Sequence, residues 1–428
     1  MFFERPESGD LAVLVHIDFN DPLNSYGPEE CVELAISAGA DPVAVVTGSR
    51  QKPDPKYFVG IGKLEEIMTI VVREEAQVVI FDHSLTPSQE RNLEEFLQCR
   101  VLDRTGLILD IFAQRARTHE GKLQVELAQL HHLSTRLIRG WTHLERQGSV
   151  GNRGPGETQL ESDRRLIRDR IKAIQQRLDK VGVQRDQSRR ARTRSATPTV
   201  SLVGYTNAGK STLFNRATGA EVYAADQLFA TLDPTLRRLD MPEIGSIVLA
   251  DTVGFIRKLP HRLVKAFQAT LKESSEANLL LHVVDASDVS RNENIQHVND
   301  VLHEIGAYEI PTLVVFNKVD ALSDVEPRID RDESGKPYRV WLSARTGEGV
   351  SLLKSAISEL LGVDVIEETL VLPRDSGKFR AFMFEHGAVV SEKFDEDGRS
   401  ILNVRLPEKD FLQILAKTGL SKEQLLVA

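Results

Sequence analysis

Short apolar runs alternate with segments of helical periodicity over the first 110 residues. Three of these runs have the length and β-branched content of buried strands: 11–16, 42–47 and 77–82. Residues 28–40 and a segment that begins near Gly62 instead space their apolar residues as amphipathic helices do. Strands separated by helices pair in parallel, because each helix carries the chain back along the sheet. Residues 1–110 are therefore predicted to form a small parallel α/β domain.

Residues 111–195 lack strand-like runs and carry an apolar stripe at helical spacing, formed by Leu123, Leu127, Leu130, Leu133 and Leu137. Glycine and proline interrupt this pattern at 148–156, and helical spacing resumes at Glu157. We expect two long antiparallel helices joined by a glycine-rich tip. A tip with so little bulk suits a narrow site, and the alternative is that it is only a flexible connector.

The remainder of the chain is predicted to form two further domains. Strand-like runs and helical segments alternate over 196–365, as in an α/β fold. From 366 to 428 the pattern predicts a strand, a helix, a β-hairpin that turns at 395–398 and a final helix, which together make a small α+β domain. The fold class is thus a multidomain α/β protein of four parts.

The apolar run 199–203 leads into Gly204-Tyr205-Thr206-Asn207-Ala208-Gly209-Lys210-Ser211-Thr212, which fits G-x-x-x-x-G-K-[ST] at every position. Glycines in such a loop let backbone N–H groups wrap nucleotide phosphates, and the following helix directs its positive end at them. Lys210 would reach the β- and γ-phosphates, and the Ser211 hydroxyl would be a ligand of Mg²⁺. This motif predicts a nucleotide site without identifying the base.

Two later loops indicate that the base is guanine. The strand-like run 312–316 precedes Asn317-Lys318-Val319-Asp320, where the Asp320 carboxylate can accept hydrogen bonds from guanine N1–H and N2–H. Adenine lacks that pair of donors and would leave a buried charge unmatched. A third strand ends in Ser343-Ala344-Arg345, where the backbone N–H of Ala344 could donate to guanine O6. Taken alone, the 317–320 motif could be a chance helix cap, but its place after a phosphate loop makes that reading weak.

The chemistry is expected between these loops, in Asp251-Thr252-Val253-Gly254 and in the segment Phe229-Ala230-Thr231-Leu232-Asp233. Asp251 would hold a water on Mg²⁺, and the N–H of Gly254 would meet the γ-phosphate. Thr231 is the preferred second hydroxyl ligand of Mg²⁺, with Thr235 as the rival that spacing does not exclude. The expected catalytic group is Lys210, Thr231, Gly254 and Asn207. The expected nucleotide contacts are the motif residues 204–212, 229–233, 251–254, 317–320 and 343–345.

Phe255 occupies the position where many GTPases place a water-orienting glutamine. A phenyl ring cannot orient water, so another group or a partner would have to complete the site. Asn207 in the phosphate loop could help to hold K⁺ in place of that glutamine, or it could simply make a local turn bond.

Charge distribution points to a polyanionic partner. Residues 111–195 contain 19 Lys and Arg against 9 Asp and Glu, a net charge of +10, which leaves −19 on the rest because the whole chain carries −9. A basic segment in an acidic protein is typical of a nucleic-acid contact, although a solvated helical face is the plain alternative. The candidate RNA contacts are Arg153, Arg164 and Arg165. Two cysteines predict neither a disulfide framework nor a metal site, and we expect a cytoplasmic monomer without a membrane span.

These motifs, together with the stretches 59–63, 103–130 and 154–161, resemble the HflX family of the Obg–HflX GTPases. The resemblance implies a GTP-hydrolysing protein that binds GTP and GDP, associates with the large ribosomal subunit and its rRNA, and splits stalled ribosomes or acts in ribosome biogenesis. Two rival hypotheses stay open on the residues alone. One is an ATP-dependent RNA-remodelling enzyme that works through the N-terminal half, where residues 60–63 could bind an anion or only cap a helix. The other is a nucleotide-gated scaffold with negligible turnover.

Overall fold

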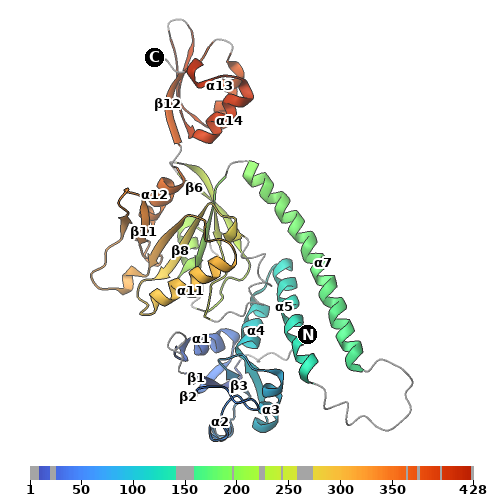
Figure 1. The fold of residues 1–428 in the computed structure, drawn as a ribbon. Coiled ribbons are helices and arrows are strands. Elements are labelled where there is room, and N and C mark those ends of the chain that lie inside the picture. The colour runs from blue at the N-terminus through green and yellow to red at the C-terminus, as the bar shows by residue number, and fades with distance from the viewer. Residues whose placement is uncertain are drawn as a thin grey trace.

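The computed structural model describes residues 9–19, 26–140, 159–194, 197–220, 227–241, 244–257, 273–362, 365–373, 376–395 and 398–425. Within them, the predicted multidomain α/β fold is confirmed (Figure 1). An N-terminal α/β domain, a helical hairpin, a larger α/β domain and a C-terminal α+β domain follow one another along the chain. The predicted tip 148–156, with Arg153, lies outside the described residues.

The N-terminal domain is a doubly wound parallel sheet in the order β2-β1-β3-β4. Its strands are β1 (Leu11–Asp18), β2 (Asp41–Ser49), β3 (Val78–Phe81) and β4 (Arg100–Asp103). Its helices are α1 (Glu29–Ala38), α2 (Ile61–Arg73), α3 (Pro87–Leu97) and α4 (Arg104–Arg115). Successive strand side chains point to opposite faces, so Ala12 and Leu14 pack with α1 and α4, whereas Val13 and Val15 pack with α2 and α3.

Helix α4 runs through the boundary expected at 110/111. Asp103 caps it, because its Oδ1 accepts the N–H of Gly106 at 2.7 Å. The run from Leu107 to Phe112 is buried throughout. A helix buried on all sides shows no amphipathic period, which explains why the sequence pattern did not resolve it.

The hairpin consists of α5 (His119–Gly140) and α7 (Gln159–Arg194), which lie side by side and antiparallel (Figure 1). Their seam is apolar and contains Leu123, Leu127, Leu130, Ile167 and Ile174. At its edge, Arg170 pairs with Glu126 at 2.6 Å. Most described side chains of α7 outside this seam are exposed, so the long helix presents a polar surface over much of its length.

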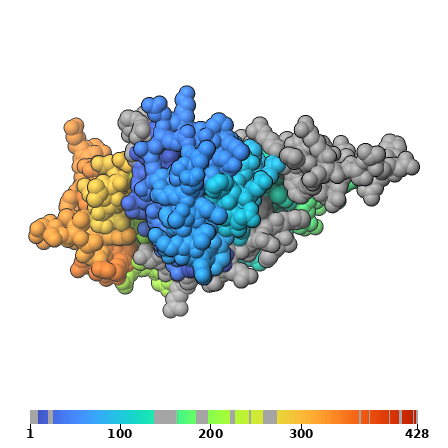
Figure 2. Space-filling view, turned by 90° about the horizontal axis from the view of Figure 1, so that it is seen from below, coloured from blue at the N-terminus to red at the C-terminus, as the bar shows by residue number. Residues whose placement is uncertain are grey.

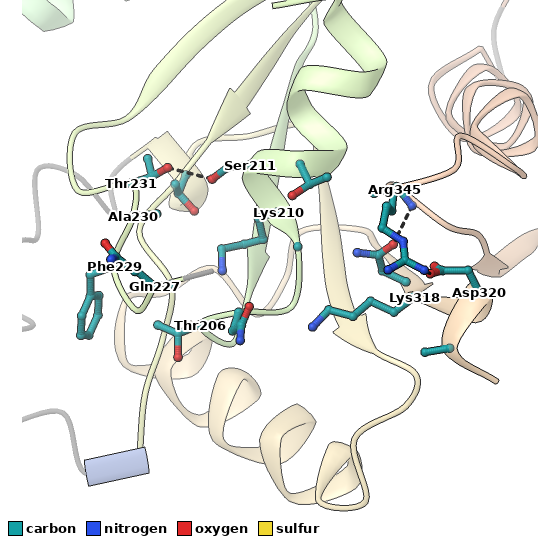
Figure 3. A pocket seen from close by; sticks show the side chains of 18 residues that line it. Thr206, Lys210, Ser211, Gln227, Phe229, Ala230, Thr231, Lys318, Asp320 and Arg345 are labelled. Atoms are coloured by element: carbon teal, nitrogen blue, oxygen red, sulfur yellow. Dashed lines mark hydrogen bonds and ion pairs between the residues drawn. The ribbon is translucent and has the colours of Figure 1, made fainter. Parts of the chain in front are cut away.

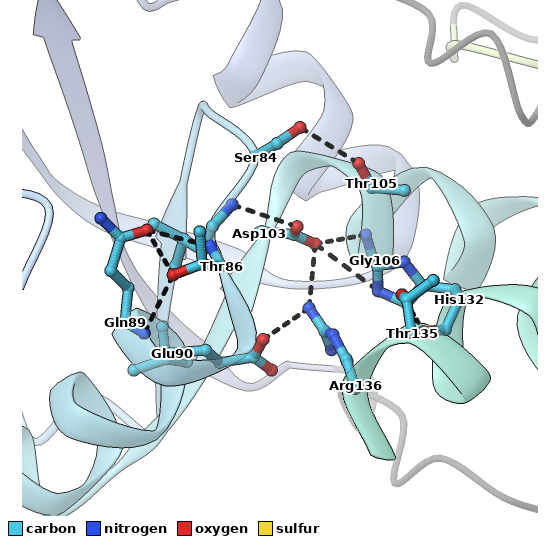
Figure 4. A network of polar contacts seen from close by, with 12 residues as sticks. Ser84, Thr86, Gln89, Glu90, Asp103, Thr105, Gly106, His132, Thr135 and Arg136 are labelled. Carbon is cyan, nitrogen blue, oxygen red and sulfur yellow. Dashed lines mark hydrogen bonds and ion pairs between the residues drawn. The ribbon is translucent and has the colours of Figure 1, made fainter. Parts of the chain in front are cut away.

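Polar contacts fix α5 to the N-terminal domain (Figure 4). Arg136 places its guanidinium 2.5 Å from Glu90 at the start of α3 and 3.4 Å from Asp103 at the end of β4. Burial raises the pKa of Glu90 to about 8, and the charge of Arg136 partly opposes this rise. The first helix of the hairpin is therefore attached to the sheet by side chains as well as by the chain itself.

The large domain has a seven-stranded sheet in the order β10-β11-β9-β8-β5-β7-β6. The strands are β5 (Thr199–Gly204), β6 (Thr235–Met241), β7 (Gly245–Asp251), β8 (Leu279–Asp285), β9 (Thr312–Asn317), β10 (Arg328–Arg331) and β11 (Pro337–Trp341). The described helices include α8 (Lys210–Thr218), α11 (Arg291–Glu304) and α12 (Val350–Leu361). Among the described strands of this sheet, only the edge strands β6 and β10 pair antiparallel with their neighbours. The carboxyl ends of β5, β7 and β9 therefore bring the sequence motifs to one edge.

The C-terminal domain forms a separate antiparallel sheet in the order β12-β14-β13. Its elements are β12 (Val365–Val371), α13 (Gly377–Glu385), β13 (Val389–Phe394), β14 (Ser400–Pro407) and α14 (Glu408–Thr418). Phe379 and Phe411 are fully buried between sheet and helices. The expected order of strand, helix, hairpin and helix is observed.

The N-terminal and large domains share one apolar core. Figure 2 shows the N-terminal domain packed directly against the large domain. The shared cluster joins Phe112 of α4 to Leu228, Phe229, Phe255 and Ile256 of the large domain. The rings of Phe112 and Phe229 meet edge to face with centroids 4.6 Å apart.

A buried polar network crosses the same contact. Arg104 binds Asp82 at 2.5 Å, contacts Glu30, and donates to the carbonyl of Arg257 at 3.0 Å. Glu30 also accepts the hydroxyl of Tyr205, and that hydroxyl accepts the N–H of Arg257 at 2.9 Å. The phosphate loop and the segment after 254 are thus bonded to the N-terminal domain.

Candidate nucleotide-binding site

A cavity of about 370 Å³ opens at the carboxyl edge of the large sheet (Figure 3). The phosphate loop forms its floor, the segment 227–231 lies on one side, and residues 317–321 with 344–345 lie on the other. Most expected contacts line it: Thr206, Asn207, Gly209, Lys210, Ser211, Thr212, Phe229, Ala230, Thr231, Thr252, Gly254, Asn317, Lys318, Asp320, Ala344 and Arg345. Five separate sequence motifs therefore meet at one cavity.

Two glycines of the phosphate loop are required by its geometry. Gly204 has φ +147°, and a Cβ there would lie 2.2 Å from the carbonyl oxygen of Val283. Gly209 has φ +90°, and a Cβ there would lie 2.2 Å from the Asn317 amide nitrogen. Both positions combine a left-handed backbone with close contact, so only glycine fits. Helix α8 begins at the next residue and directs its free N–H groups into the cavity.

Lys210 is buried with its ammonium turned onto its own loop. Nζ donates to the carbonyls of Gly204 at 3.1 Å and Tyr205 at 2.7 Å. Burial lowers the pKa of Lys210 to about 8, and the charge of Asp251 partly opposes this. Nearby His282 is held neutral, because burial and the charge of Lys210 lower its pKa to about 4. Among these groups, Lys210 is the cation available to a phosphate.

Three oxygens converge where a Mg²⁺ ion is expected. The hydroxyls of Ser211 and Thr231 are 2.8 Å apart, and they donate to Asp251 Oδ2 at 2.7 and 2.9 Å. Asp251 Oδ1 is buried and has no hydrogen-bond partner within the described part of the chain. Burial raises the pKa of Asp251, while the bonds from Ser211 and the charge of Lys210 oppose this. A hard-oxygen set with an unsatisfied carboxylate oxygen fits Mg²⁺.

The register of β6 separates the two candidate threonines. Thr235 is the first residue of β6 and pairs with Asp251 across the antiparallel ladder. Thr231 lies four residues earlier, and its hydroxyl lies 2.8 Å from that of Ser211. The geometry therefore favours Thr231 over Thr235.

The base end of the cavity is organised by Asn317. Its amide donates to the carbonyl of Ala208 at 2.9 Å, and its Oδ1 accepts the N–H of Ala344 at 2.9 Å. Asp320 accepts the Ser343 hydroxyl at 2.5 Å and pairs with Arg345 at 2.5 Å. Only 13% of the Asp320 side chain is exposed, against 79% of Arg345, so Arg345 can leave without disturbing the core. A base that offers two N–H groups would then meet the carboxylate.

The ring of Phe255 does not face the cavity. Its backbone N–H donates to Gly204 at 3.1 Å, and its carbonyl accepts the N–H of Thr206 at 2.8 Å. These two bonds fix the direction of the side chain, which packs into the shared core with 1% exposed. At Gly254 a Cβ would lie 2.8 Å from Thr206 and 3.0 Å from Lys210 Nζ, so this segment touches the phosphate loop.

Several expected residues do not line the cavity: Gly204, Tyr205, Ala208, Leu232, Asp233, Asp251, Val253, Val319 and Ser343. Most of them hold the lining residues in place, as Asp251 does through Ser211. Asp233 differs, because its carboxylate turns away to Arg117 and Thr118. Two lining residues, Gln227 and Ala321, were not predicted. Ala321 directly follows the 317–320 motif, so its position in the sequence could have predicted that it lines the cavity.

The remaining candidates lie elsewhere. Arg164 and Arg165 are on α7 and do not line the cavity, and Arg165 is exposed. At the 60–63 turn, Lys63 donates to the carbonyl of Thr47 at 2.9 Å and pairs with Glu66 at 2.7 Å. No helix in the ranges given above is long and apolar enough to cross a lipid bilayer.

A phosphate loop, a hydroxyl–carboxylate cluster and a base loop at the carboxyl edge of a mainly parallel sheet are the arrangement of a P-loop GTPase. Family models match in sequence order: a GTP-binding GTPase N-terminal region at 26–113, its middle region at 115–192, a 50S ribosome-binding GTPase domain at 199–318 and an HflX C-terminal domain at 330–425. The GTPase HflX of Escherichia coli (strain K12) is 61% identical over 413 residues, covering 96% of this chain and 97% of that one. The GTPase HflX of Magnetococcus marinus is 46% identical over 379 residues, covering 87% of each.

The chain therefore belongs to the HflX family of GTPases. It binds GTP and hydrolyses it to GDP and phosphate. A solved structure of a GTP-binding protein from the archaeon Sulfolobus solfataricus, in complex with GDP, aligns over 82% of this chain and 99% of that one, at 24% identity and a TM-score of 0.44.

Proposed function

We propose that this GTPase acts on the large ribosomal subunit, where its helical hairpin contacts rRNA and its GTP state controls the contact. The basic helix α7 supports this most directly, because it carries 12 Lys and Arg against 5 Asp and Glu in a chain of net charge −9. The match of 199–318 to a domain described as a 50S ribosome-binding GTPase supports it independently. Splitting of stalled ribosomes, or a step in ribosome assembly, is the proposed outcome. We further propose that the protein acts in the cytoplasm as a monomer.

The proposed hydrolysis uses the residues around the cavity. Lys210 neutralises the β- and γ-phosphates, and the N–H of Gly254 binds the γ-phosphate. Ser211, Thr231 and Asp251 would hold Mg²⁺, which would offset phosphate charge when bound. Asp320 selects guanine, with Ala344 and Asn317 shaping the same pocket. Asn207 lines the phosphate side, where we propose that it helps to hold K⁺.

Because Phe255 points into the shared core, the side chain that follows Gly254 cannot orient the attacking water. We propose that the ribosome supplies or orders the missing group. Basal turnover is then slow and ribosome-stimulated turnover is fast, which separates this proposal from a scaffold with negligible turnover.

Replacing residues 149–156 by a short Gly-Ser turn tests the hairpin contact. Basal GTP hydrolysis should persist, because every cavity residue lies beyond residue 200. Ribosome-stimulated hydrolysis and subunit splitting should be lost, as measured by phosphate release and by sedimentation with GDP or a non-hydrolysable GTP analogue. A full response to ribosomes would contradict the hairpin contact and move the partner to the first or last domain.

A charge test uses matched pairs of arginines. Arg164→Gln with Arg165→Gln on α7 should weaken ribosome binding and reduce its salt dependence, because each phosphate contact releases a counterion. Arg237→Gln with Arg238→Gln on β6 removes the same charge from an exposed surface of the large domain and should change neither ribosome binding nor its salt dependence. Equal effects from both pairs would indicate only a general loss of charge.

A further inference from the structure

Asp233 makes an unusually complete contact with the start of the hairpin. Its Oδ2 accepts the backbone N–H groups of Arg117 and Thr118, both at 2.9 Å. Its Oδ1 accepts the Thr118 hydroxyl at 2.5 Å. One carboxylate from the large domain thus receives three hydrogen bonds from the corner between α4 and α5, more than 110 residues away in sequence.

The corner is shaped to receive this carboxylate. The Thr118 hydroxyl accepts the N–H of Gly121 at 2.9 Å and so caps α5. A Cβ at Gly121 would lie 2.1 Å from Asp233 Oδ1, so a side chain at 121 and the observed Asp233 position exclude each other. The helix start also favours a negative charge.

The other end of the same segment is also attached to the N-terminal half. Arg115 contacts the side chain of Gln227, and the N–H of Leu228 donates to the Ser37 hydroxyl at 3.0 Å. Thr231 lies between these two attachments, with its hydroxyl on Ser211. The segment 227–233 is therefore held at both ends by the N-terminal half, and its middle carries the proposed Mg²⁺ ligand.

We propose that Asp233 is a positioning residue for GTP hydrolysis, which holds Thr231 at the Mg²⁺ site by docking on the start of α5. The proposal rests on the proposed role of Thr231. Because Arg136 pairs with Glu90 and Asp103, α5 is fixed to the N-terminal domain, and the site at the start of α5 that binds Asp233 is fixed with it. We call this site the dock. By reciprocity, a displacement of α5 by a bound partner changes how well Thr231 holds the ion.

Asp233→Ala tests the proposal. Three hydrogen bonds to a carboxylate are lost, so the Mg²⁺ concentration for half-maximal hydrolysis should rise about tenfold, at unchanged nucleotide affinity in the absence of Mg²⁺. Mg²⁺ should also slow the dissociation of a fluorescent, non-hydrolysable GTP analogue less than in the parent, which needs no turnover. Asp240→Ala, which removes an exposed carboxylate from β6 of the same domain, should leave both values unchanged.

Gly121→Ala tests the dock from the hairpin side. The added methyl group overlaps the carboxylate position, so Mg²⁺ dependence should shift as in Asp233→Ala although alanine favours the helix. Gly182→Ala makes the same change on α7, where a Cβ meets nothing within 4 Å, and should not shift it. Tryptic cleavage after Arg117 in the nucleotide-free protein should accelerate in Gly121→Ala and Asp233→Ala only.

A double-mutant cycle separates this inference from the proposed site. Thr231→Ala should itself raise the Mg²⁺ requirement, and adding Asp233→Ala to it should have no further effect, because Asp233 acts through Thr231. If Thr231→Ala changes nothing, the proposed Mg²⁺ ligand is wrong. If Thr231→Ala shifts the requirement but Asp233→Ala and Gly121→Ala do not, the positioning role alone is overturned.

Discussion

Restoring a glutamine after Gly254 should damage this GTPase rather than activate it. Phe255→Gln places an amide where many GTPases use one to orient water. In this chain, however, two backbone bonds to the phosphate loop fix residue 255 so that its side chain enters the core shared with the N-terminal domain. The glutamine would be buried among apolar groups and could not reach the cavity.

The cost follows from this burial. The Phe255 side chain is 1% exposed. Deleting a buried phenylalanine ring costs about 3–5 kcal/mol, and an amide buried without a partner costs about 1–3 kcal/mol more. Glutamine refills part of the volume, so we expect a net loss of about 3–5 kcal/mol of unfolding free energy, a large share of the roughly 5–15 kcal/mol typical of a domain.

Urea unfolding followed by circular dichroism measures this loss, and phosphate release measures activity at low urea. Phe394→Gln is the matched control, because this phenylalanine is 66% exposed and should cost little. Phe255→Leu, which keeps an apolar side chain, should recover most of the stability. A Phe255→Gln protein as stable as its parent and faster in basal hydrolysis would refute the assignment of this side chain to the core.

Three further predictions concern the cavity. Asp320→Asn should weaken GTP binding about a hundredfold or more and shift preference toward xanthine nucleotides, since an amide pairs with the 2-oxo group of xanthine; unchanged GTP and XTP affinities would exclude the guanine assignment. In the nucleotide-free protein Lys210 has a pKa of about 8, so it loses its charge as the pH rises above that value and must take up a proton to bind phosphate. GTP affinity should therefore fall above about pH 8, and binding there should be accompanied by proton uptake. Calorimetry in two buffers measures this uptake, which should be absent in Lys210→Met. K⁺ should stimulate hydrolysis more than Na⁺ at matched ionic strength, and Asn207→Ala should abolish the difference; equal rates in the parent would leave Asn207 as a loop residue.

The spacing of apolar residues predicted those helices and strands in which burial on one face repeats with a regular period. The strands at 11–18 and 41–49, the helical hairpin and the order of the C-terminal domain all follow from apolar spacing. The elements it missed include α4, whose apolar run is buried on all sides, and the edge strands β6 and β10, whose charged residues hide the strand pattern. Burial on all sides removed the contrast that reveals a helical period in α4, and charged residues obscured the alternation of the two edge strands.

The site was predicted where residue identity alone decides the chemistry, as in the phosphate loop and the 317–320 motif. It could not be predicted where a contact joins distant segments. The choice of Thr231 over Thr235 depends on the register of β6, the direction of Phe255 on backbone pairing with Gly204, and the role of Asp233 on a partner at Thr118. Such contacts come from how domains pack, and no spacing within one segment records them.

The shared apolar core changes what can be learned by cutting the chain. Family matches end at 192 and begin again at 199, so a fragment starting near residue 196 looks self-contained by sequence. That fragment, however, would expose Leu228, Phe229 and Phe255 to water as one apolar surface. It would also remove the backbone N–H groups that Asp233 binds. A change in GTP hydrolysis by such a fragment would reflect damage to the large domain and not the loss of an inhibitory effect of the N-terminal half. The two domains should therefore be studied by single substitutions at their shared core rather than by separating them.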